Sequence, residues 1–391
     1  MNRNAAGVFV QEIMLDFARL TGLEPANPHP QRYLWTDAFA VCNYIELFSR
    51  TGDATFWDLG LRLVGQVHQT LGRHRDDDPR CGWISGLGEK EGEEHQTIGG
   101  LRIGKQLNER GPHDPPDERL EWDRDGQYYH YLTKWMHALN CVARAAGDPT
   151  YTKWAIELAK TAHARFTFKP PYGGRKRIRW KMSIDLSRPL VSSMGQHDPL
   201  DGFVTYSELQ AAATGDFGES LPLDLKSEIA EISEICRGID LVTIDPLGIG
   251  GLLFDASRIG QLIMLGGSKS LSLLEAVLEA ALIGMEAFVR GETLDHPAEC
   301  RLAFRELGVS IGLSAVEDLL KWVEERPSIF SRNSSLQGRV EDLVAYLPLR
   351  EVIERFWMDS GNREASTWTD HREINMVMLA TSLAPGGFLT I

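Results

Sequence analysis

One short segment of the sequence combines side chains that acid–base chemistry needs. "GQHDPLDGF", residues 195–203, places the imidazole of His197 and the carboxylates of Asp198 and Asp201 within five positions. Imidazole and carboxyl groups can remove and return protons near neutral pH when their pKa values are tuned. The same residues also suit a helix start, because Asp before Pro199 is a favoured N-cap and a carboxylate at the third helical position meets exposed N–H groups. The segment alone leaves catalysis and helix capping both open.

Helices must position these residues, because helical periodicity dominates the chain and one internal repeat is visible. The repeat pairs "RYLWTDAFAVCNYIELFSRTGDATFWDLGLRLVGQVHQTL" with "QYYHYLTKWMHALNCVARAAGDPTYTKWAIELAKTAHARF", and the Gly-Asp pairs at 52 and 147 align with an offset of 147 − 52 = 95. Each unit predicts a nearly all-apolar buried helix, a Gly C-cap followed by a capping Asp, and an amphipathic outer helix.

Further helical hairpins follow the same pattern. Buried helices are predicted to start near Asp198, Asp245 and His296, and their amphipathic followers are "LDLKSEIAEISEICRG", "KSLSLLEAVLEAALIGMEAFVRG" and "SAVEDLLKWVEERP". Pairing the N-terminal helix "VFVQEIMLDFARL" with the last apolar helix "REINMVMLATSL" would close a ring of six hairpins. The helix predicted near 338–356 is then an additional element.

This alternation resembles the (α/α)6 toroid of six-hairpin glycosidases and N-acylglucosamine 2-epimerases, in which outer helices surround six inner ones. "GDPTYTKWAIELAKTAHARF" is similar to the outer-helix pattern of the epimerase group. The resemblance implies an all-α fold with short β-hairpins in its loops and a single toroidal domain over residues 1–391. It also implies a substrate funnel where the starts of the inner helices converge.

Polar and aromatic residues recur at these predicted inner-helix starts, which are "RYLWTD", "DGQYYH", "HDPLD", "DPLG", "DHPAE" and "DHRE". Capping accounts for a carboxylate at such a position, but it does not account for the histidines and aromatic residues. The predicted catalytic residues are Asp37, Asp125, His130, His197, Asp198, Asp201 and His371. The predicted substrate-binding residues are Arg32, Tyr33, Trp35, Tyr128, Tyr129, His296, Trp368 and Arg372.

This set of side chains suits a sugar, because aromatic rings pack on its C–H faces while polar groups bind its hydroxyls. Our leading hypothesis is a carbohydrate-active enzyme of the glycosidase type, which needs one protonated and one ionised carboxyl group. The first alternative is a sugar 2-epimerase or isomerase that uses inner-helix histidines. For that group the resemblance implies a histidine after a tryptophan on the last inner helix, as Trp368 and His371 provide. The second alternative is a non-catalytic toroid that binds sugars or peptides.

Composition disfavours several other classes of protein. A net charge of −14 argues against nucleic acid as a partner. The five cysteines lack CxxC spacing, which suits a reducing cytoplasm and gives no zinc signature. With no apolar segment of membrane-spanning length and no cleavage signal, we expect a cytoplasmic protein with no membrane partner. We expect no metal and no cofactor, and the sequence does not indicate an oligomeric state.

Two polar segments stand apart from the helical pattern. Residues 73–124 form a long insertion in which "GGLRIGKQ" has the spacing of a P-loop, but Gln106 replaces the required Ser or Thr. We expect a surface loop, or a lid whose Arg102, Lys105 and Arg110 could meet an anionic substrate. The basic run 173–182 predicts a short hairpin with one solvated face, with anion binding as the alternative.

Overall fold

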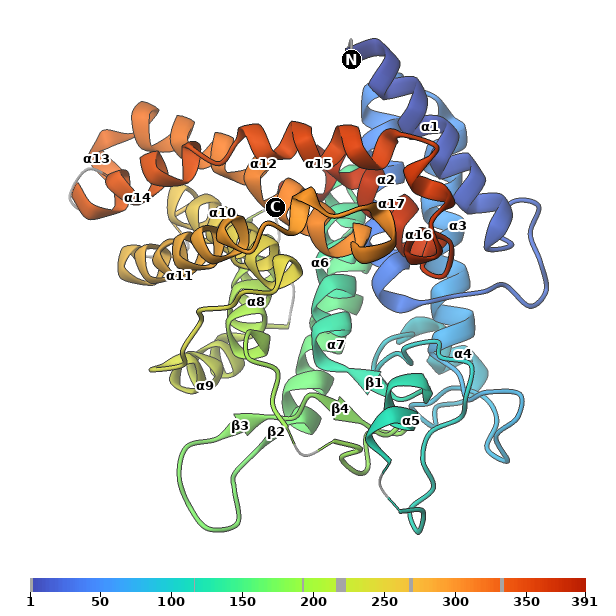
Figure 1. Ribbon diagram of the computed structural model, residues 1–391. Coiled ribbons are helices and arrows are strands. Elements are labelled where there is room, and N and C mark those ends of the chain that lie inside the picture. Colours follow the sequence, from blue (N-terminus) through green and yellow to red (C-terminus); the bar gives the residue numbers. More distant parts are fainter. Residues whose placement is uncertain (1–2, 116, 192, 216–222, 267–269, 331–333) are drawn as a thin grey trace. The chain divides into compact units, whose positions relative to one another are not determined.

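A computed structural model confirms a predominantly helical fold (Figure 1). The structure describes residues 3–115, 117–191, 193–215, 223–266, 270–330 and 334–391. The chain forms two compact units, which we call the first unit (Ala18–Ile239) and the second unit (Met1–Phe17 with Asp240–Ile391). Helix α1 (Arg3–Leu20) contributes to both units. That the two units close into a single toroidal domain stays a prediction.

The first unit contains three helical hairpins, as the sequence predicts. Their helices are α2 (Leu34–Thr51) with α3 (Ala54–Leu71), α6 (Tyr129–Ala146) with α7 (Pro149–Phe166), and α8 (Asp198–Gly215) with α9 (Lys226–Cys236). The middle buried helix, α6, packs against both α2 and α8. The repeated Gly-Asp pairs join the first two hairpins, because Gly52 and Gly147 take left-handed φ angles of 71° and 65°. The following residues, Asp53 and Asp148, are the N-caps of the next helices, and their side chains accept hydrogen bonds from backbone N–H groups in the first turn.

Among the described residues, the insertion, the basic run and the segments that flank them form short elements. These are α4 (Glu89–Glu94), α5 (Glu118–Asp123), β1 (Gln127–Tyr128), β2 (Thr167–Phe168), β3 (Arg177–Ile178) and β4 (Lys181–Met182). Strands β2 and β3 form an antiparallel hairpin, whereas β4 pairs with β1 through the register Gln127↔Met182. Arg177 is exposed as predicted, but the prediction of a solvated face is wrong for Lys181, which is fully buried. Its ammonium group donates to the carbonyl oxygen of Arg124 at 2.8 Å.

The second unit is also helical. Its helices are α10 (Pro246–Met264), α11 (Leu271–Arg290), α12 (Ala303–Glu325), α13 (Pro327–Phe330), α14 (Ser334–Val344), α15 (Pro348–Met358), α16 (Ser366–Thr369), α17 (Arg372–Leu383) and α18 (Gly386–Leu389). Short 3-10 turns cover Thr293–Asp295, Ala298–Cys300 and Asn362–Glu364. Helix α12 packs against α10, α14, α15 and α17. Nowhere in the described part of the chain does a helix combine the length and apolar character needed to cross a bilayer.

One predicted hairpin of the second unit is wrong. The sequence predicts a buried helix starting near His296 and a separate outer helix "SAVEDLLKWVEERP", but α12 runs unbroken through this boundary. No proline or capping glycine interrupts the segment, so the helix continues from buried to exposed surroundings. The small residues in this segment indicate a closely packed inner helix, and in the structure they allow α12 to approach α10 closely. A Cβ atom on Gly250 would lie 2.0 Å from the carbonyl oxygen of Gly308.

Candidate functional site

The interface between α6 and α8 carries a series of buried polar contacts, which we call the polar ladder. Its three rungs are Asp198 with His130, Asp201 with Thr133 and Lys134, and Glu208 with His137 and Asn140. The three carboxylate side chains are at most 7% exposed. Burying several carboxylates at one helix interface destabilises a protein unless each is paired or protonated. This concentration of titratable groups makes the ladder the candidate site.

The first rung is an acid–base pair with unfilled hydrogen-bonding capacity. Asp198 Oδ1 lies 3.8 Å from His130 Nδ1, too far for a hydrogen bond. Within the described residues, Asp198 Oδ2 and His130 Nδ1 are both buried without a hydrogen-bond partner. The His130 side chain is nevertheless 31% exposed, so the pair is not sealed from solvent. A substrate with hydroxyl or carbonyl groups could satisfy these atoms.

The surroundings of the pair move the two pKa values in opposite directions. Burial, and then the negative charge of Asp201, raises the pKa of Asp198 to about 8. Burial, and then the positive charge of Lys134, lowers the pKa of His130 to about 4. Near neutral pH the carboxyl group therefore carries a proton and the imidazole does not. An acid and a base with separated pKa values are typical of catalytic sites.

Asp201, on the second rung, is a fixed anion. Its two oxygens accept from Thr133 Oγ1 at 2.5 Å and from Lys134 Nζ at 2.8 Å. Because Thr133 and Lys134 each engage one oxygen, the Asp201 carboxylate is not open toward a substrate. We therefore assign Asp201 the role of holding Lys134 and raising the pKa of Asp198.

The structure corrects the predicted start of α8. The backbone N–H of Asp201 donates to the carbonyl oxygen of His197 at 3.0 Å, so His197 occupies the N-cap position. Asp198 is the first helical residue, and the prediction that it is the N-cap is wrong. Pro199 is tolerated at the second helical position because its missing N–H is not needed there. Helix capping therefore does not explain the Asp198 carboxyl group.

Aromatic side chains surround the first rung, and we call them the aromatic rim: Tyr33, Trp35, Tyr128, Tyr131 and Trp180. The rings of Tyr128 and Trp180 stack with centroids 4.9 Å apart, and Tyr131 meets His130 edge-on at 4.7 Å. The hydroxyl groups of Tyr33 and Tyr131 are 2.6 Å apart. Since Tyr33 and Tyr128 are the N-cap residues of α2 and α6, the starts of α2, α6 and α8 meet within the first unit.

Arg32 and Asp37 form a bracket that recurs in the second unit. Arg32 Nη1 lies 3.2 Å from Asp37 Oδ1, and its Nη2 donates to the carbonyl oxygen of Thr21 at 2.8 Å. Arg301 likewise pairs with Glu306 at 2.6 Å and donates to a loop carbonyl at 2.8 Å. Both arginines precede their carboxylate by five residues, in "RYLWTD" and "RLAFRE". The repetition favours a structural role, although burial raises the pKa of Asp37 to about 6.

Asp125 anchors the long insertion. It is fully buried and accepts from Arg102 Nη1 at 2.5 Å and from the backbone N–H groups of Gly104 and Gly126 at 3.0 Å. Arg110 is similarly engaged by Glu121 at 2.5 Å. Two of the three cations proposed for a lid therefore hold the insertion in place. These contacts leave Asp125 no evident catalytic role.

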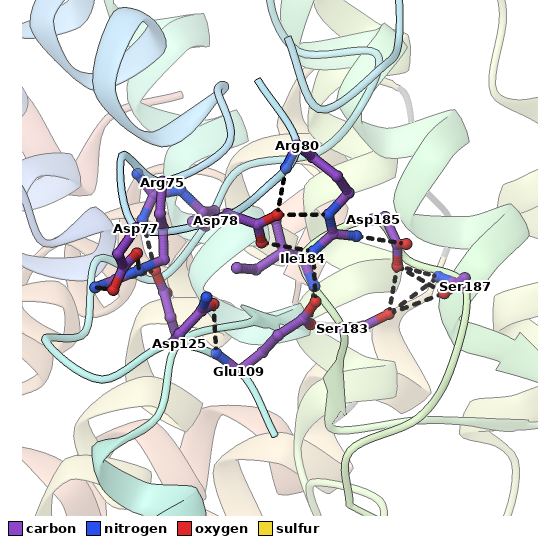
Figure 2. A network of polar contacts seen from close by, with 12 residues as sticks. Arg75, Asp77, Asp78, Arg80, Glu109, Asp125, Ser183, Ile184, Asp185 and Ser187 are labelled. Carbon is purple, nitrogen blue, oxygen red and sulfur yellow. Dashed lines mark hydrogen bonds and ion pairs between the residues drawn. The ribbon is translucent and has the colours of Figure 1, made fainter. Parts of the chain in front are cut away.

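Figure 2 shows how the same insertion is tied to the loop after β4. Arg80 contacts Asp78, Glu109 and Asp185, and the backbone N–H of Ile184 donates to Glu109 at 2.7 Å. Lys105, in contrast, forms no ion pair with the described residues. Its ammonium nitrogen lies 5.3 Å from the centroid of the Tyr33 ring, so a cation stands beside the aromatic rim.

Five further predicted residues belong neither to the polar ladder nor to the aromatic rim. Tyr129 is buried in the core, where its hydroxyl group donates to Tyr206 at 2.9 Å. Four predicted residues belong to the second unit: His296, Trp368, His371 and Arg372. His296 and His371 are exposed, and buried Trp368 stacks on Trp357 with centroids 5.7 Å apart. Trp368 and Arg372 line a separate pocket of about 450 Å³ within the second unit. The functional roles of these four residues stay predictions.

Comparison with known proteins does not assign a family. No family model matches the sequence, and no curated protein matches it. Among solved structures, the chain is similar to cellobiose 2-epimerase from Bacillus thermoamylovorans B4167, with a TM-score of 0.44 and 9% sequence identity over 81% of this chain and 76% of that chain. A likeness of this extent carries no argument about activity, which depends on the residues of the site itself.

Proposed function

We propose that the first unit carries an acid–base site for a small polyhydroxylated substrate, and that its reaction is epimerisation or isomerisation of a sugar. The observation that carries this proposal is the first rung of the ladder. There a buried carboxyl group and an imidazole face each other at 3.8 Å, each with an unpartnered atom. Each unsatisfied buried polar group needs an explanation, and these two atoms belong to neighbouring groups that can exchange protons.

The two groups have the protonation states that such a reaction needs. Neutral His130 can accept the proton of a C–H group beside a carbonyl, while protonated Asp198 donates a proton to the carbonyl oxygen. The resulting enediol returns the hydroxyl proton to Asp198. The His130 imidazolium then gives its proton to the neighbouring carbon, which yields the isomer, or to the opposite face of the same carbon after the enediol has turned, which yields the epimer. No C–O bond is broken, so no second carboxylate is required.

Glycoside hydrolysis, our leading hypothesis from the sequence, finds less support. It requires a protonated carboxyl group and an ionised carboxylate that is open to water or to the sugar. Of the four predicted carboxylates, Asp37, Asp125 and Asp201 are each held by a buried or partly buried cation. Asp198 alone among these four keeps an unpartnered oxygen. One free carboxyl group beside one imidazole favours proton transfer over hydrolysis.

The aromatic rim supports a sugar as the substrate. The partly exposed rings of Tyr131 and Trp180 lie 4.7 Å and 6.4 Å from that of His130 between centroids, and aromatic rings pack on the C–H faces of pyranoses. Lys105, beside Tyr33, adds a positive charge that would favour a carboxylate or phosphate on the substrate. We therefore include uronic acids and sugar phosphates among the candidate substrates.

The test combines hydrogen exchange and hydrolysis. The protein is incubated in deuterated water with a panel of free aldoses, uronic acids, sugar phosphates and reducing disaccharides, and NMR follows deuterium entry beside the carbonyl. Parallel samples contain nitrophenyl glycosides. We expect exchange without nitrophenol release, and a loss of about 10²-fold or more in Asp198→Asn and His130→Gln. His163→Gln is the matched control, because His163 belongs to the same unit but contacts Glu231 at 3.7 Å and the ring of Tyr206, neither of which is part of the rim.

Each other result contradicts the proposal. Release of nitrophenol without exchange would favour a glycosidase. Neither exchange nor hydrolysis across the panel would favour a binding protein. Exchange that survives both substitutions at the first rung would place the chemistry elsewhere.

A further inference from the structure

The third rung of the ladder adjoins two buried cysteines. The Sγ atoms of Cys42 on α2 and Cys141 on α6 lie within 4.8 Å of each other and of a ring nitrogen of His137. His137 Nε2 is 3.6 Å from Cys141 Sγ. All three side chains are buried, with relative exposures of 2% or less. Sequence spacing does not reveal this cluster, because Cys42 and Cys141 are far apart in the chain.

We propose that Cys42, His137 and Cys141 bind a zinc ion inside the first unit. Two thiolates and one imidazole are ligands that zinc prefers. The ion would link α2 to α6 in the core. The proposal is independent of the chemistry proposed for Asp198 and His130.

The distances fit tetrahedral zinc. Ordinary Zn–S and Zn–N bonds place neighbouring sulfur and nitrogen ligands about 3.6 Å apart and two sulfur ligands about 3.8 Å apart. The observed separation of 3.6 Å between His137 Nε2 and Cys141 Sγ equals the first of these values. Because all three atoms lie within 4.8 Å, the Cys42 thiol needs to approach by about 1 Å at most. His137 and Cys141 are four residues apart on one helix face, which fixes their relative position.

The histidine is oriented as a metal ligand should be. Glu208 lies 2.9 Å and 3.0 Å from His137 Nδ1 through its two oxygens, which leaves Nε2 facing the thiols. Asn140 Nδ2 donates to the same carboxylate at 3.0 Å and keeps it in position. Histidines that bind metals almost always donate their other N–H to a carboxylate or carbonyl group. Under this proposal, the buried contact between Glu208 and His137 orients a metal ligand.

The charges around the cluster also suit a divalent ion. Two thiolates neutralise Zn²⁺, and Arg144, 3.6 Å from Cys141 Sγ, balances the charge of Glu208. A buried site with no net charge avoids the large cost of an uncompensated ion. Three protein ligands leave the fourth position to a water molecule.

The experiment measures metal content directly. The full chain is purified from zinc-supplemented cells without chelators, and mass spectrometry of the elements gives the zinc content per chain. We expect close to one zinc ion per chain in the wild type and at least a tenfold loss in Cys42→Ser and Cys141→Ser. Cys81→Ser and Cys300→Ser are matched controls, because these two cysteines are exposed, and both should keep the ion.

A second measurement covers variants that fail to fold. Wild-type protein refolded with Co²⁺ should show a thiolate-to-cobalt charge-transfer band in the near ultraviolet, and Glu208→Gln should weaken zinc binding by about 10- to 100-fold in competition with a chelator. Wild-type protein that holds no zinc after refolding with Zn²⁺, or holds stoichiometric copper, would overturn the proposal. So would serine variants that keep the zinc ion, or a disulfide between Cys42 and Cys141. None of these outcomes depends on whether the protein acts on a sugar.

Discussion

Asp198→Asn tests the proposed acid–base site through stability as well as through activity. Asn keeps the shape and neutrality of the protonated carboxyl group, but it cannot donate or accept the catalytic proton. Because folding raises the pKa of Asp198 from 3.8 to about 8, the folded state binds more protons than the unfolded state between these values. The free energy of unfolding therefore falls as pH rises from about 4 to about 8. Replacing Asp198 by Asn removes this cost.

The size of the effect follows from the shift. Each pKa unit corresponds to about 1.4 kcal/mol, so at pH 7 the roughly three units above the value of 3.8 set an upper limit of about 4 kcal/mol. Partial relaxation of the site reduces this, and we expect Asp198→Asn to gain about 1–2 kcal/mol at pH 7. The gain should vanish near pH 4 and be largest at pH 8 and above. Loss of activity combined with a gain in stability is typical of catalytic residues.

Urea unfolding of wild type and variant at pH 4, 5, 6, 7 and 8 measures this difference. Asp201→Asn is the matched control, because its carboxylate is already paired with Lys134 and the substitution removes this negative charge from beside a partly buried ammonium group. This variant should lose about 1–3 kcal/mol at pH 7. An Asp198→Asn variant that is less stable than wild type at pH 8, or whose stability difference does not change with pH, would refute the assignment of a protonated, functional Asp198.

Two further predictions concern catalysis and the arginine brackets. The rate of proton exchange should fall at low pH, because His130 gains a proton toward its pKa of about 4, and at high pH, because Asp198 loses its proton around pH 8. Measurement of kcat/KM from pH 4 to 10 checks this. A rate that rises steadily to pH 10 would contradict it. Arg32→Lys and Arg301→Lys should each destabilise their unit by about 2–4 kcal/mol, because lysine cannot make both contacts of the planar guanidinium group. The exchange activity per folded molecule should stay unchanged. Urea titrations with activity measured below the transition test this, and inactive but stable Arg32→Lys protein would return Arg32 to the site.

The sequence was most informative where structure is local. The helical fold and the first three hairpins follow from hydrophobic periodicity and from the Gly-Asp pairs, because a left-handed glycine and a capping aspartate act within a few residues. The prediction of a hairpin near His296 is wrong because small residues, followed by a change to charged residues, also occur within a single long helix. Only the contact of Gly308 with α10 distinguishes the two cases, and that contact is long-range.

Prediction of the site was limited for the same reason. His130, Asp198 and Asp201 were identified from residue type at predicted helix starts, and the structure brings them together. Arg32 and Asp37 had the same types and positions, but their charges bind each other. Trp180 was overlooked as part of a basic run, and the cluster of Cys42, His137 and Cys141 has no sequence spacing that would reveal it. Its only local signal is a histidine four residues before a cysteine on one helix.

The polar ladder shows how one helix interface accommodates three buried carboxylates in three different ways. Asp201 is neutralised by Lys134, and Glu208 is held by its contacts with His137 Nδ1 and Asn140 Nδ2. Among the described residues Asp198 has a backbone hydrogen bond from Gly195 and the more distant His130, and it is neutral because it keeps its proton. The first two solutions use complete contacts, so they stabilise the interface and hold its geometry. The third leaves an oxygen and a ring nitrogen unsatisfied at the end of the ladder that reaches solvent. Since an apolar pair there would fold at lower cost, the incomplete rung is better explained by a bound substrate than by stability.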